Sequence, residues 1–200
     1  MFNCMIAGVG GQGTVLASKL IAIAAMKSGF DVRTTETIGM AQRGGSVVSH
    51  IRIGENIDSI FSPIIPSGNA HAIIAFEPAE AVRQLPFLSP QGYLITCGTA
   101  VKSIGYSGNS QNITYESSVM VEFLKANIAN LTIIDSGKIM ERYSKALNVA
   151  FLGAAAEWGV FPFDSAALEE ILPEIVPERF LELNIAAFKL GRELYNEYNK

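Results

Sequence analysis

Apolar positions along the chain gather into short runs, and several of the stretches between them have helical spacing. Strand-length apolar runs occur at residues 3–9, 31–36, 47–53, 71–76, 93–97 and 131–135. Helical spacing predicts helices at about 12–28, 78–85, 118–127, 138–158 and 178–197. This alternation predicts an α/β fold, with a Rossmann-like, doubly wound and mostly parallel sheet that carries helices on both faces.

The predicted elements occupy most of the chain. Its 200 residues, of which 49% are hydrophobic, are enough for one sizeable core, so we predict a single domain over residues 1–200. The segment 98–118 is rich in Gly, Ser and Asn, and this composition predicts a long connection with one short strand in it.

The predicted strands differ in the polarity of their faces. Residues 71–76 and 131–135 are apolar almost throughout, as expected of central strands that are buried on both faces. In the third run, the period of two places Val48, His50 and Arg52 on one face, which is therefore polar and basic. This spacing fits a solvated edge strand after an ordinary turn and a ligand site equally well.

Charge and hydropathy exclude two classes of partner. The net charge is -4 and no two basic residues are adjacent, so the chain lacks the positive field that nucleic acid or anionic lipid would require. The longest apolar stretches, 20–26 and 149–156, are much shorter than the roughly 20 residues needed to cross a bilayer. The apolar start has no basic leader and predicts a first strand rather than a signal peptide. We expect a cytoplasmic protein.

The two cysteines point to packing rather than chemistry. Cys4 and Cys97 both lie in apolar, strand-like runs, where a buried free thiol is the favoured interpretation over a ligand or a disulfide. A cubane iron–sulfur cluster takes four thiolates, so this chain alone cannot hold one. We predict no metal site and no catalytic residue in this chain.

The sequence IAGVGGQG at residues 6–13 has the Gly-x-Gly-x-x-Gly spacing of a dinucleotide loop. In that interpretation Gly8 permits the tight turn, Gly10 lets the backbone approach a phosphate, and Gly13 lets the helix pack on the strand. The helix N-terminus then offers N–H groups and partial positive charge to an anion. Glu36 stands near the position of an acid that would bind a ribose hydroxyl. One interpretation is therefore a freestanding nicotinamide- or flavin-dependent oxidoreductase.

Other features weaken that interpretation. The two histidines, His50 and His71, lie within or at the start of predicted strands, and for His71 a structural role at the N-terminal edge of its strand is favoured. The sheet pattern also leaves no room for a substrate domain. A further interpretation is a plain interaction module that keeps its glycines only for backbone geometry.

A second glycine pair lies in the sequence ETIGMAQRGGSVVSHIRI at residues 36–53. The loop in it carries Gln42, Arg43, Gly44 and Gly45. Two adjacent glycines let the backbone come close to a flat or anionic group, while the arginine supplies charge and a planar set of donors.

Two acidic residues, Glu77 and Asp135, follow the runs at 71–76 and 131–135, at the carboxyl edge where open α/β sheets bind ligands. We favour a capping role for both, with Pro78 at the first position of its helix.

Taken in order, these motifs carry a resemblance. GVGGQG, GMAQRGGSVVSHIR, AFEP, the LNVAFLGA run at 147–154 and a closing helix with NIAAF and Gly191 resemble the gamma-type subunits of 2-oxoacid:ferredoxin oxidoreductases. The resemblance is closest to the small, beta subunit of the indolepyruvate oxidoreductases. It extends from Gly8 to about Gly191, and the pair of glycine motifs in this order is specific.

The resemblance implies a required but noncatalytic subunit that is not active alone. It implies that a larger catalytic partner holds thiamine diphosphate and [4Fe-4S] clusters, attacks the 2-oxo carbon of an arylpyruvate, releases carbon dioxide and passes electrons to ferredoxin, while coenzyme A takes the acyl group. The subunit itself would help to close the site and would share coenzyme A at the interface. We also expect that the isolated chain can form a homodimer.

Residue by residue, the resemblance places two loops at the carboxyl edge of the sheet. Gly10, Gly11, Gln12 and Gly13 would form the loop at the first helix. Gln42, Arg43, Gly44 and Gly45 would form a loop that faces the partner's active site. We expect the two loops to lie side by side, with the helix N-terminus and Arg43 meeting the phosphates of coenzyme A or a carboxylate of the partner.

Overall fold

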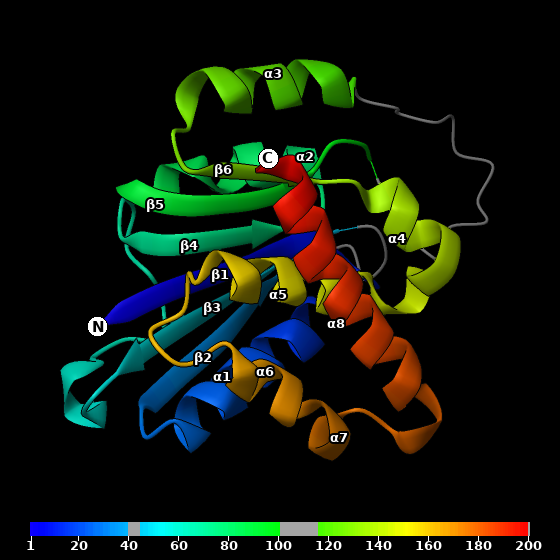
Figure 1. The fold of residues 1–200 in the computed structure, drawn as a ribbon. Helices are drawn as coiled ribbons and strands as arrows, with labels where there is room; N and C mark the ends of the chain where they lie inside the picture. Colours follow the sequence, from blue (N-terminus) through cyan, green and yellow to red (C-terminus); the bar gives the residue numbers. More distant parts are fainter. Residues whose placement is uncertain (40–44, 101–115, 200) are drawn as a thin grey trace.

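One sheet runs through the computed structural model, which describes residues 1–39, 45–100 and 116–199 (Figure 1). The strands described are β1 (Phe2–Val9), β2 (Asp31–Ile38), β3 (Ser46–Gly54), β4 (Ala70–Ala75), β5 (Leu88–Cys97) and β6 (Leu131–Ile134). Their order in the sheet is β2-β3-β1-β4-β5-β6. The pairs β1–β4, β4–β5 and β5–β6 are parallel, and β3 is antiparallel to both of its neighbours. The predicted mostly parallel α/β sheet is confirmed.

Helices cover both faces of the sheet (Figure 1). On one face lie α1 (Thr14–Lys27), α4 (Ser136–Tyr143), α5 (Leu147–Trp158), α6 (Ala166–Glu170), α7 (Leu172–Ile175) and α8 (Glu178–Tyr198). On the other lie α2 (Pro78–Gln84) and α3 (Ser117–Asn127). Single turns of 3-10 helix occur at η1 (Ile57–Ser59), η2 (Leu85–Phe87) and η3 (Ser144–Ala146). None of the helices described combines the length and the hydrophobicity that a membrane span requires.

The period of two along the central strands builds a core on each side of the sheet. In β1, Cys4 and Ile6 pack under α1 and α5, while Met5 packs under α2. In β4, Ile74 packs on the first side and Ile73 on the second. Residues 72–76 are buried, which confirms a central strand covered on both faces, whereas His71 at its start is exposed.

The last strand differs from its prediction. β6 is the outermost strand on its side of the described sheet, not a central one. Thr132 and Ile134 are buried, but Leu131 and Ile133 are only half-buried. The apolar run packs against α8 on one face of the sheet, although no strand of the described residues pairs with the outer side of β6.

The third strand is not a solvated edge. β3 lies between β2 and β1, and β2 is the exposed edge strand. The polar face of β3 is covered by the chain that follows it: His50 Nδ1 accepts a hydrogen bond from Ile65 N at 3.3 Å, and Arg52 donates to the Ser62 carbonyl at 2.6 Å. Backbone groups of a covering segment thus satisfy these two polar side chains, and the solvated-edge alternative for this strand is wrong.

The predicted helix at 138–158 is broken. The backbone leaves the helical region at Ala146, where φ is -126° and ψ is 24°, so α4 and η3 are separated from α5. Between α5 and α8, the short helices α6 and α7 were not predicted, because five and four residues are too few to show a helical period. The short strand predicted within 98–118 falls largely on residues 101–115, outside the described residues.

Two glycines allow α5 and α8 to pack in direct backbone contact. A Cβ atom at Gly153 would overlap the Phe188 carbonyl, and one at Gly191 would overlap the Ala150 carbonyl. This contact explains why Gly191 belongs to the closing helix motif: any side chain there would force the two helices apart.

Candidate functional site

The glycine loop joins β1 to α1 at the carboxyl edge of the sheet. Gly11 and Gly13 have φ values of 99° and 81°, in the left-handed region that favours glycine. Gln12 N donates to the Val9 carbonyl at 3.1 Å, which closes the turn. These two glycines, and not Gly8, therefore provide the unusual backbone angles of the loop.

Gly8 lies near the end of β1, and its lack of a side chain leaves room for the turn that follows, although its own backbone is that of a strand. A Cβ atom there would lie 2.8 Å from Gln12 Oε1 and 3.0 Å from the Phe76 ring. Only a residue without a side chain lets the Gln12 amide fold back against the strand.

The Gln12 side chain ties the loop to the next strand. Its Oε1 accepts a hydrogen bond from Val9 N at 2.8 Å, and its Nε2 donates to Glu77 Oε1 at 2.7 Å. Glu77 follows β4 and its residue is only 4% exposed. The Gln12 amide therefore provides a hydrogen-bond acceptor for the backbone N–H of Val9 and a donor for the buried Glu77 carboxylate.

The two predicted capping residues behave differently. Asp135 does cap α4, since its Oδ1 accepts from Gly137 N at 3.0 Å and from Lys138 N at 3.4 Å. Glu77 occupies the position before α2, but its side chain makes no capping hydrogen bond. The capping prediction for Glu77 is wrong because the carboxylate turns toward Gln12 instead.

The described end of the second loop lies directly beside the first. Gly10 N donates to the Gly45 carbonyl at 3.0 Å, and β3 begins at the next residue, Ser46. Of the predicted site residues, Gly8, Gly10, Gly11, Gln12, Gly13 and Gly45 are thus brought together, whereas Gln42, Arg43 and Gly44 lie outside the described residues.

A second carboxylate of α2 supports the base of the second loop. Ser46 Oγ donates to Glu80 Oε2 at 2.6 Å, and Arg83 forms an ion pair with the same carboxylate. Glu80 is 3% exposed. Glu77, just before α2, and Glu80, in its first turn, therefore support one loop each.

Asn148, at the start of α5, supports the glycine loop from the opposite side. Its Nδ2 donates to the Gly13 carbonyl at 3.0 Å, and a Cβ atom at Gly13 would lie 2.5 Å from the same nitrogen. Sequence reasoning did not assign Glu80 or Asn148. Asn148 lies in the LNVAFLGA motif, and Glu80 follows the AFEP motif by two residues. Their closeness to these motifs was the only sequence feature that pointed to them.

The cysteine at the end of β5, Cys97, has a buried and unreactive thiol. Cys97 Sγ lies 3.0 Å from the Thr99 carbonyl and 3.3 Å from the Phe76 carbonyl. Burial, and secondly the negative charge of Glu77, raise the pKa of the Cys97 thiol to about 12. Cys4 is also buried and free, and burial raises its pKa. The prediction of two buried free thiols is confirmed, and neither is a nucleophile at neutral pH.

The histidines have structural partners. Burial lowers the pKa of His50, so the ring is neutral, and it packs edge-on against Phe87 with 6.0 Å between the ring centroids. His71 Nδ1 accepts a hydrogen bond from Asn3 N at 3.1 Å, which confirms its predicted structural role. Across residues 1–39, 45–100 and 116–199, no three His, Cys, Asp or Glu side chains are grouped so as to hold a metal ion.

The sheet order bears on the nicotinamide interpretation. Glu36 lies on β2, and β3 separates β2 from β1 and its glycine loop. Strands in a sheet are about 4.8 Å apart, so the inserted strand moves Glu36 roughly 10 Å from β1. An acid that binds the ribose would instead stand on the strand next to the loop. Glu36 is therefore misplaced for that role.

Among the described residues, the carboxyl edge presents an uncapped helix N-terminus. No side chain of the described residues caps the N-terminus of α1, where Gly13 is the capping residue, and its first turn has no acidic residue. The N–H groups of that turn and the helix dipole favour an anion. Hollows of about 400 Å³ and about 280 Å³ open nearby, the first beside Gly39 and Ser46 and the second beside Thr99 and Ser136.

Comparisons with known proteins agree on one family. The model of the family "Pyruvate ferredoxin/flavodoxin oxidoreductase" matches residues 3–194. The indolepyruvate oxidoreductase subunit IorB of Archaeoglobus fulgidus is 36% identical over 198 residues, which cover 98% of this chain and 94% of that protein.

Two solved structures share the fold. The gamma subunit of a keto/oxoacid ferredoxin oxidoreductase from Geobacter sulfurreducens has a TM-score of 0.69 and 23% identity, covering 98% of this chain and 99% of that chain. The 2-oxoglutarate:ferredoxin oxidoreductase from Magnetococcus marinus, solved with 2-oxoglutarate, coenzyme A and succinyl-CoA bound, has a TM-score of 0.68 and 18% identity, covering 98% of this chain and 31% of that chain. Together with the family match over nearly the whole length, these likenesses mean that the chain belongs to the pyruvate ferredoxin/flavodoxin oxidoreductase family.

Proposed function

We propose that this chain is the small, noncatalytic subunit of a 2-oxoacid:ferredoxin oxidoreductase that acts on indolepyruvate or a related arylpyruvate. The observation that carries the proposal is the family match over residues 3–194, together with a relative of nearly equal length that is named an indolepyruvate oxidoreductase subunit. The site supports a subunit role, because both histidines and both thiols are occupied in packing and hydrogen bonding.

The redox chemistry then belongs to a larger partner. We assign to that partner the thiamine diphosphate that attacks the 2-oxo carbon and the [4Fe-4S] clusters that pass electrons to ferredoxin. Cys4 and Cys97 fit this division, since they lie on different strands with protonated, buried thiols and are not arranged as cluster ligands. Homodimers of the isolated chain remain a prediction.

The part that this chain plays is to present its carboxyl edge to the partner's active site. Gly10 N is already used by Gly45, so we assign anion contact to the first turn of α1 and to Arg43. Coenzyme A carries phosphates that suit both groups. The relative from Magnetococcus marinus, whose structure holds coenzyme A, lends support to this choice of ligand.

Two buried carboxylates near the loops affect whether a phosphate can bind at this edge. Glu77 and Glu80 lie behind the two loops, and their negative charge would repel a phosphate across a low-dielectric region. The Gln12 amide stands between Glu77 and the loop, and Arg83 pairs with Glu80. Arg43 would supply the remaining positive charge. Its guanidinium is thus the group on which phosphate binding at this edge depends.

The test uses the assembled enzyme with Arg43→Ala. We expect the apparent KM for coenzyme A to rise by about tenfold, the effect of losing one charge-assisted hydrogen bond, with the reduction potentials of the clusters unchanged. The matched control is Arg33→Ala, which removes an exposed arginine from β2. An unchanged KM and unchanged assembly in Arg43→Ala would refute the assignment of this loop.

A further inference from the structure

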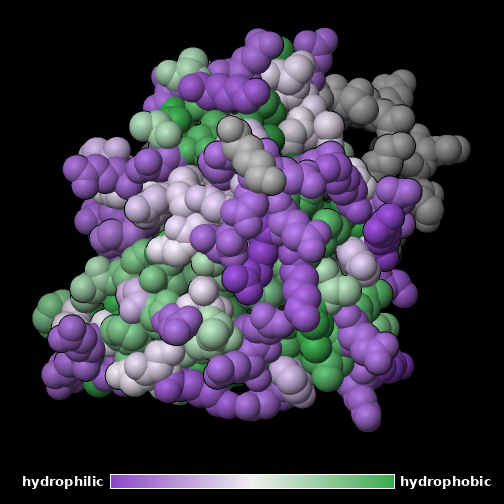
Figure 2. All heavy atoms as spheres, viewed as in Figure 1, coloured by the Kyte–Doolittle hydropathy of each residue, from purple (hydrophilic) through white to green (hydrophobic). Residues whose placement is uncertain are grey.

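A hollow of about 330 Å³ lies at the amino edge of the sheet, where β1 begins and β3 ends. Its lining residues are Met1, Phe2, Phe30, Ile53, Gly54, Glu55 and Pro162. We call it the amino-edge hollow. It is open to solvent, because Met1, Glu55 and Pro162 are exposed, and Ile53, only 1% exposed, lies at its base. Figure 2 shows apolar residues reaching the surface on the side of the molecule where the N-terminus lies in Figure 1.

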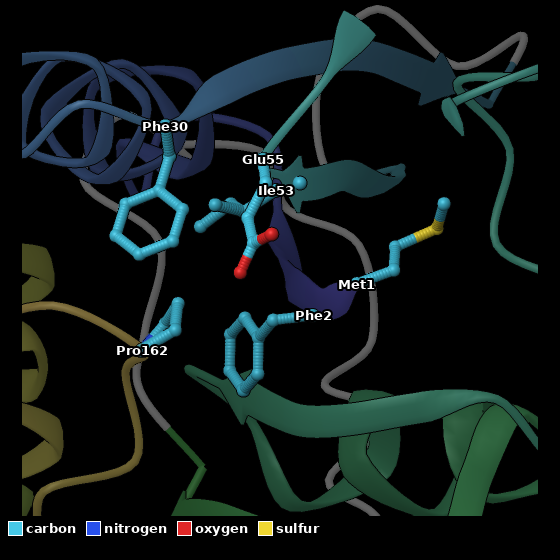
Figure 3. A pocket seen from close by; sticks show the side chains of 7 residues that line it. Met1, Phe2, Phe30, Ile53, Glu55 and Pro162 are labelled. Atoms are coloured by element: carbon cyan, nitrogen blue, oxygen red, sulfur yellow. The ribbon is translucent and has the colours of Figure 1, made fainter. Parts of the chain in front are cut away.

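One carboxylate projects into the amino-edge hollow. Figure 3 shows Glu55 reaching between the rings of Phe30 and Phe2, with Pro162 beside them. No residue in the described part of the chain forms an ion pair or hydrogen bond with the Glu55 side chain. Glu55 is exposed, so its unpaired carboxylate is accessible to a cation that approaches from outside the molecule.

The aromatic walls are held in place. The Phe2 ring packs edge-on against Phe161, with 6.4 Å between centroids, and lies 5.4 Å from the His71 ring. Phe161 in turn stacks on Phe163. Phe30 is fixed at its backbone, where its N–H donates to the Ala25 carbonyl at 3.1 Å. The hollow is therefore a built feature of the amino edge.

The combination of a carboxylate with aromatic and proline faces matches a guanidinium group. A guanidinium is planar and weakly hydrated on its faces, so it stacks on aromatic rings, while its N–H edge pairs with a carboxylate through two hydrogen bonds. We propose that the amino-edge hollow receives an arginine side chain presented by a partner protein in the assembled enzyme. The solvent-open mouth suits a side chain that arrives on a second surface, and the chain's own net charge of -4 favours a cationic partner.

The experiment is a methyl NMR titration of the full chain. The probe is N-acetyl-arginine amide, and the matched probe is N-acetyl-citrulline amide, which has nearly the same shape without the charge. The reporter is the Ile53 methyl at the base of the hollow, and Ile95 in the opposite half of the sheet reports nonspecific effects. The variants are Glu55→Gln and the control Glu122→Gln, an exposed acid on α3.

We expect the arginine probe to shift Ile53 in a saturable way and the citrulline probe to bind about tenfold more weakly. Glu55→Gln should weaken the arginine probe by a similar factor, and Glu122→Gln should not. In the assembled enzyme, the same titration should leave Ile53 unshifted, because the partner's arginine already fills the hollow. Equal binding of the two probes, an unaffected Glu55→Gln variant, or an Ile53 methyl that still responds in the assembled enzyme would each overturn the proposal.

Discussion

Gln12 and Glu77 form a direct link between the glycine loop and the end of β4, with 2.7 Å between Nε2 and Oε1. The other end of the same amide accepts from Val9 N at 2.8 Å. The amide must therefore present its oxygen to the loop and its nitrogen to the carboxylate, which fixes its orientation. This link joins two residues 65 positions apart, and it adds to the parallel pairing of β1 with β4 that brings both motifs to one edge.

Gln12→Glu tests this link. Two carboxylates would then face each other in a buried site, and we expect the free energy of unfolding at pH 8 to fall by about 2 kcal/mol or more. Such a pair holds a proton, so its folded pKa lies above that of the unfolded chain. The loss should therefore shrink as the pH falls toward about 5, where protonation restores a hydrogen bond. Urea unfolding at both pH values measures it.

The control for that variant is the double change Gln12→Glu with Glu77→Gln. It reverses the pair and restores one donor and one acceptor, so much of the lost stability should return. A double variant as unstable as the sum of the two single variants would show that the two side chains are not coupled.

Gly13→Ala should destabilise the chain more than Gly29→Ala. Both glycines have positive φ values, 81° and 87°, so both variants carry backbone strain of about 1 kcal/mol or more. A Cβ atom at Gly13 also meets Asn148, whereas nothing lies within 4 Å of one at Gly29. We expect an additional loss of about 1–3 kcal/mol at Gly13 from overpacking, measured by chemical denaturation. Equal losses would mean that Asn148 moves aside freely.

Gly191→Ala should separate α5 from α8. The added methyl group would overlap the Ala150 carbonyl, which is backbone and cannot rotate away. We expect a loss of about 3 kcal/mol in the free energy of unfolding, at the upper end for overpacked cores. Glu193→Ala, an exposed change on the same helix, should stay within about 0.5 kcal/mol of the parent chain. Thermal unfolding of the two variants gives the comparison.

Cys97 should resist alkylation in the native chain. Its pKa of about 12 leaves almost no thiolate at pH 8, and Cys4 is equally buried. The folded pKa lies above the unfolded value, so this thiol favours folding below the unfolded pKa and that contribution is lost as the pH rises toward 12. In Glu77→Gln, we expect iodoacetamide to label Cys97 faster relative to Cys4, read by mass spectrometry. An unchanged ratio would exclude a charge effect of Glu77 on the thiol.

The strands could be predicted from sequence because a strand that is buried on both faces gives a short, nearly continuous apolar run, as in β1 and β4. The place of β3 could not, because its polar face is covered by backbone groups near Ser62 and Ile65, and backbone donors leave no pattern in the sequence. The break at Ala146 could not be predicted either, because the helical spacing of apolar residues continues across it.

The candidate site was predicted in part. The glycine loop was located by its spacing, and a Cβ atom at Gly8 would meet Gln12 and Thr14, but the positive φ values lie at Gly11 and Gly13. Glu77 was taken for a cap because it precedes Pro78, and a local signal of that kind is stronger than a partner 65 residues away. Asn148 had no local signal beyond the motif that contains it.

The most direct test of the central claim is an arylpyruvate-dependent assay of the purified catalytic partner, anaerobic and with a viologen dye, with and without this chain. We expect reduction that depends on coenzyme A only when the chain is bound. A partner that is fully active by itself, with the same KM for coenzyme A, would contradict the account. So would a chain that purifies alone and binds a nicotinamide.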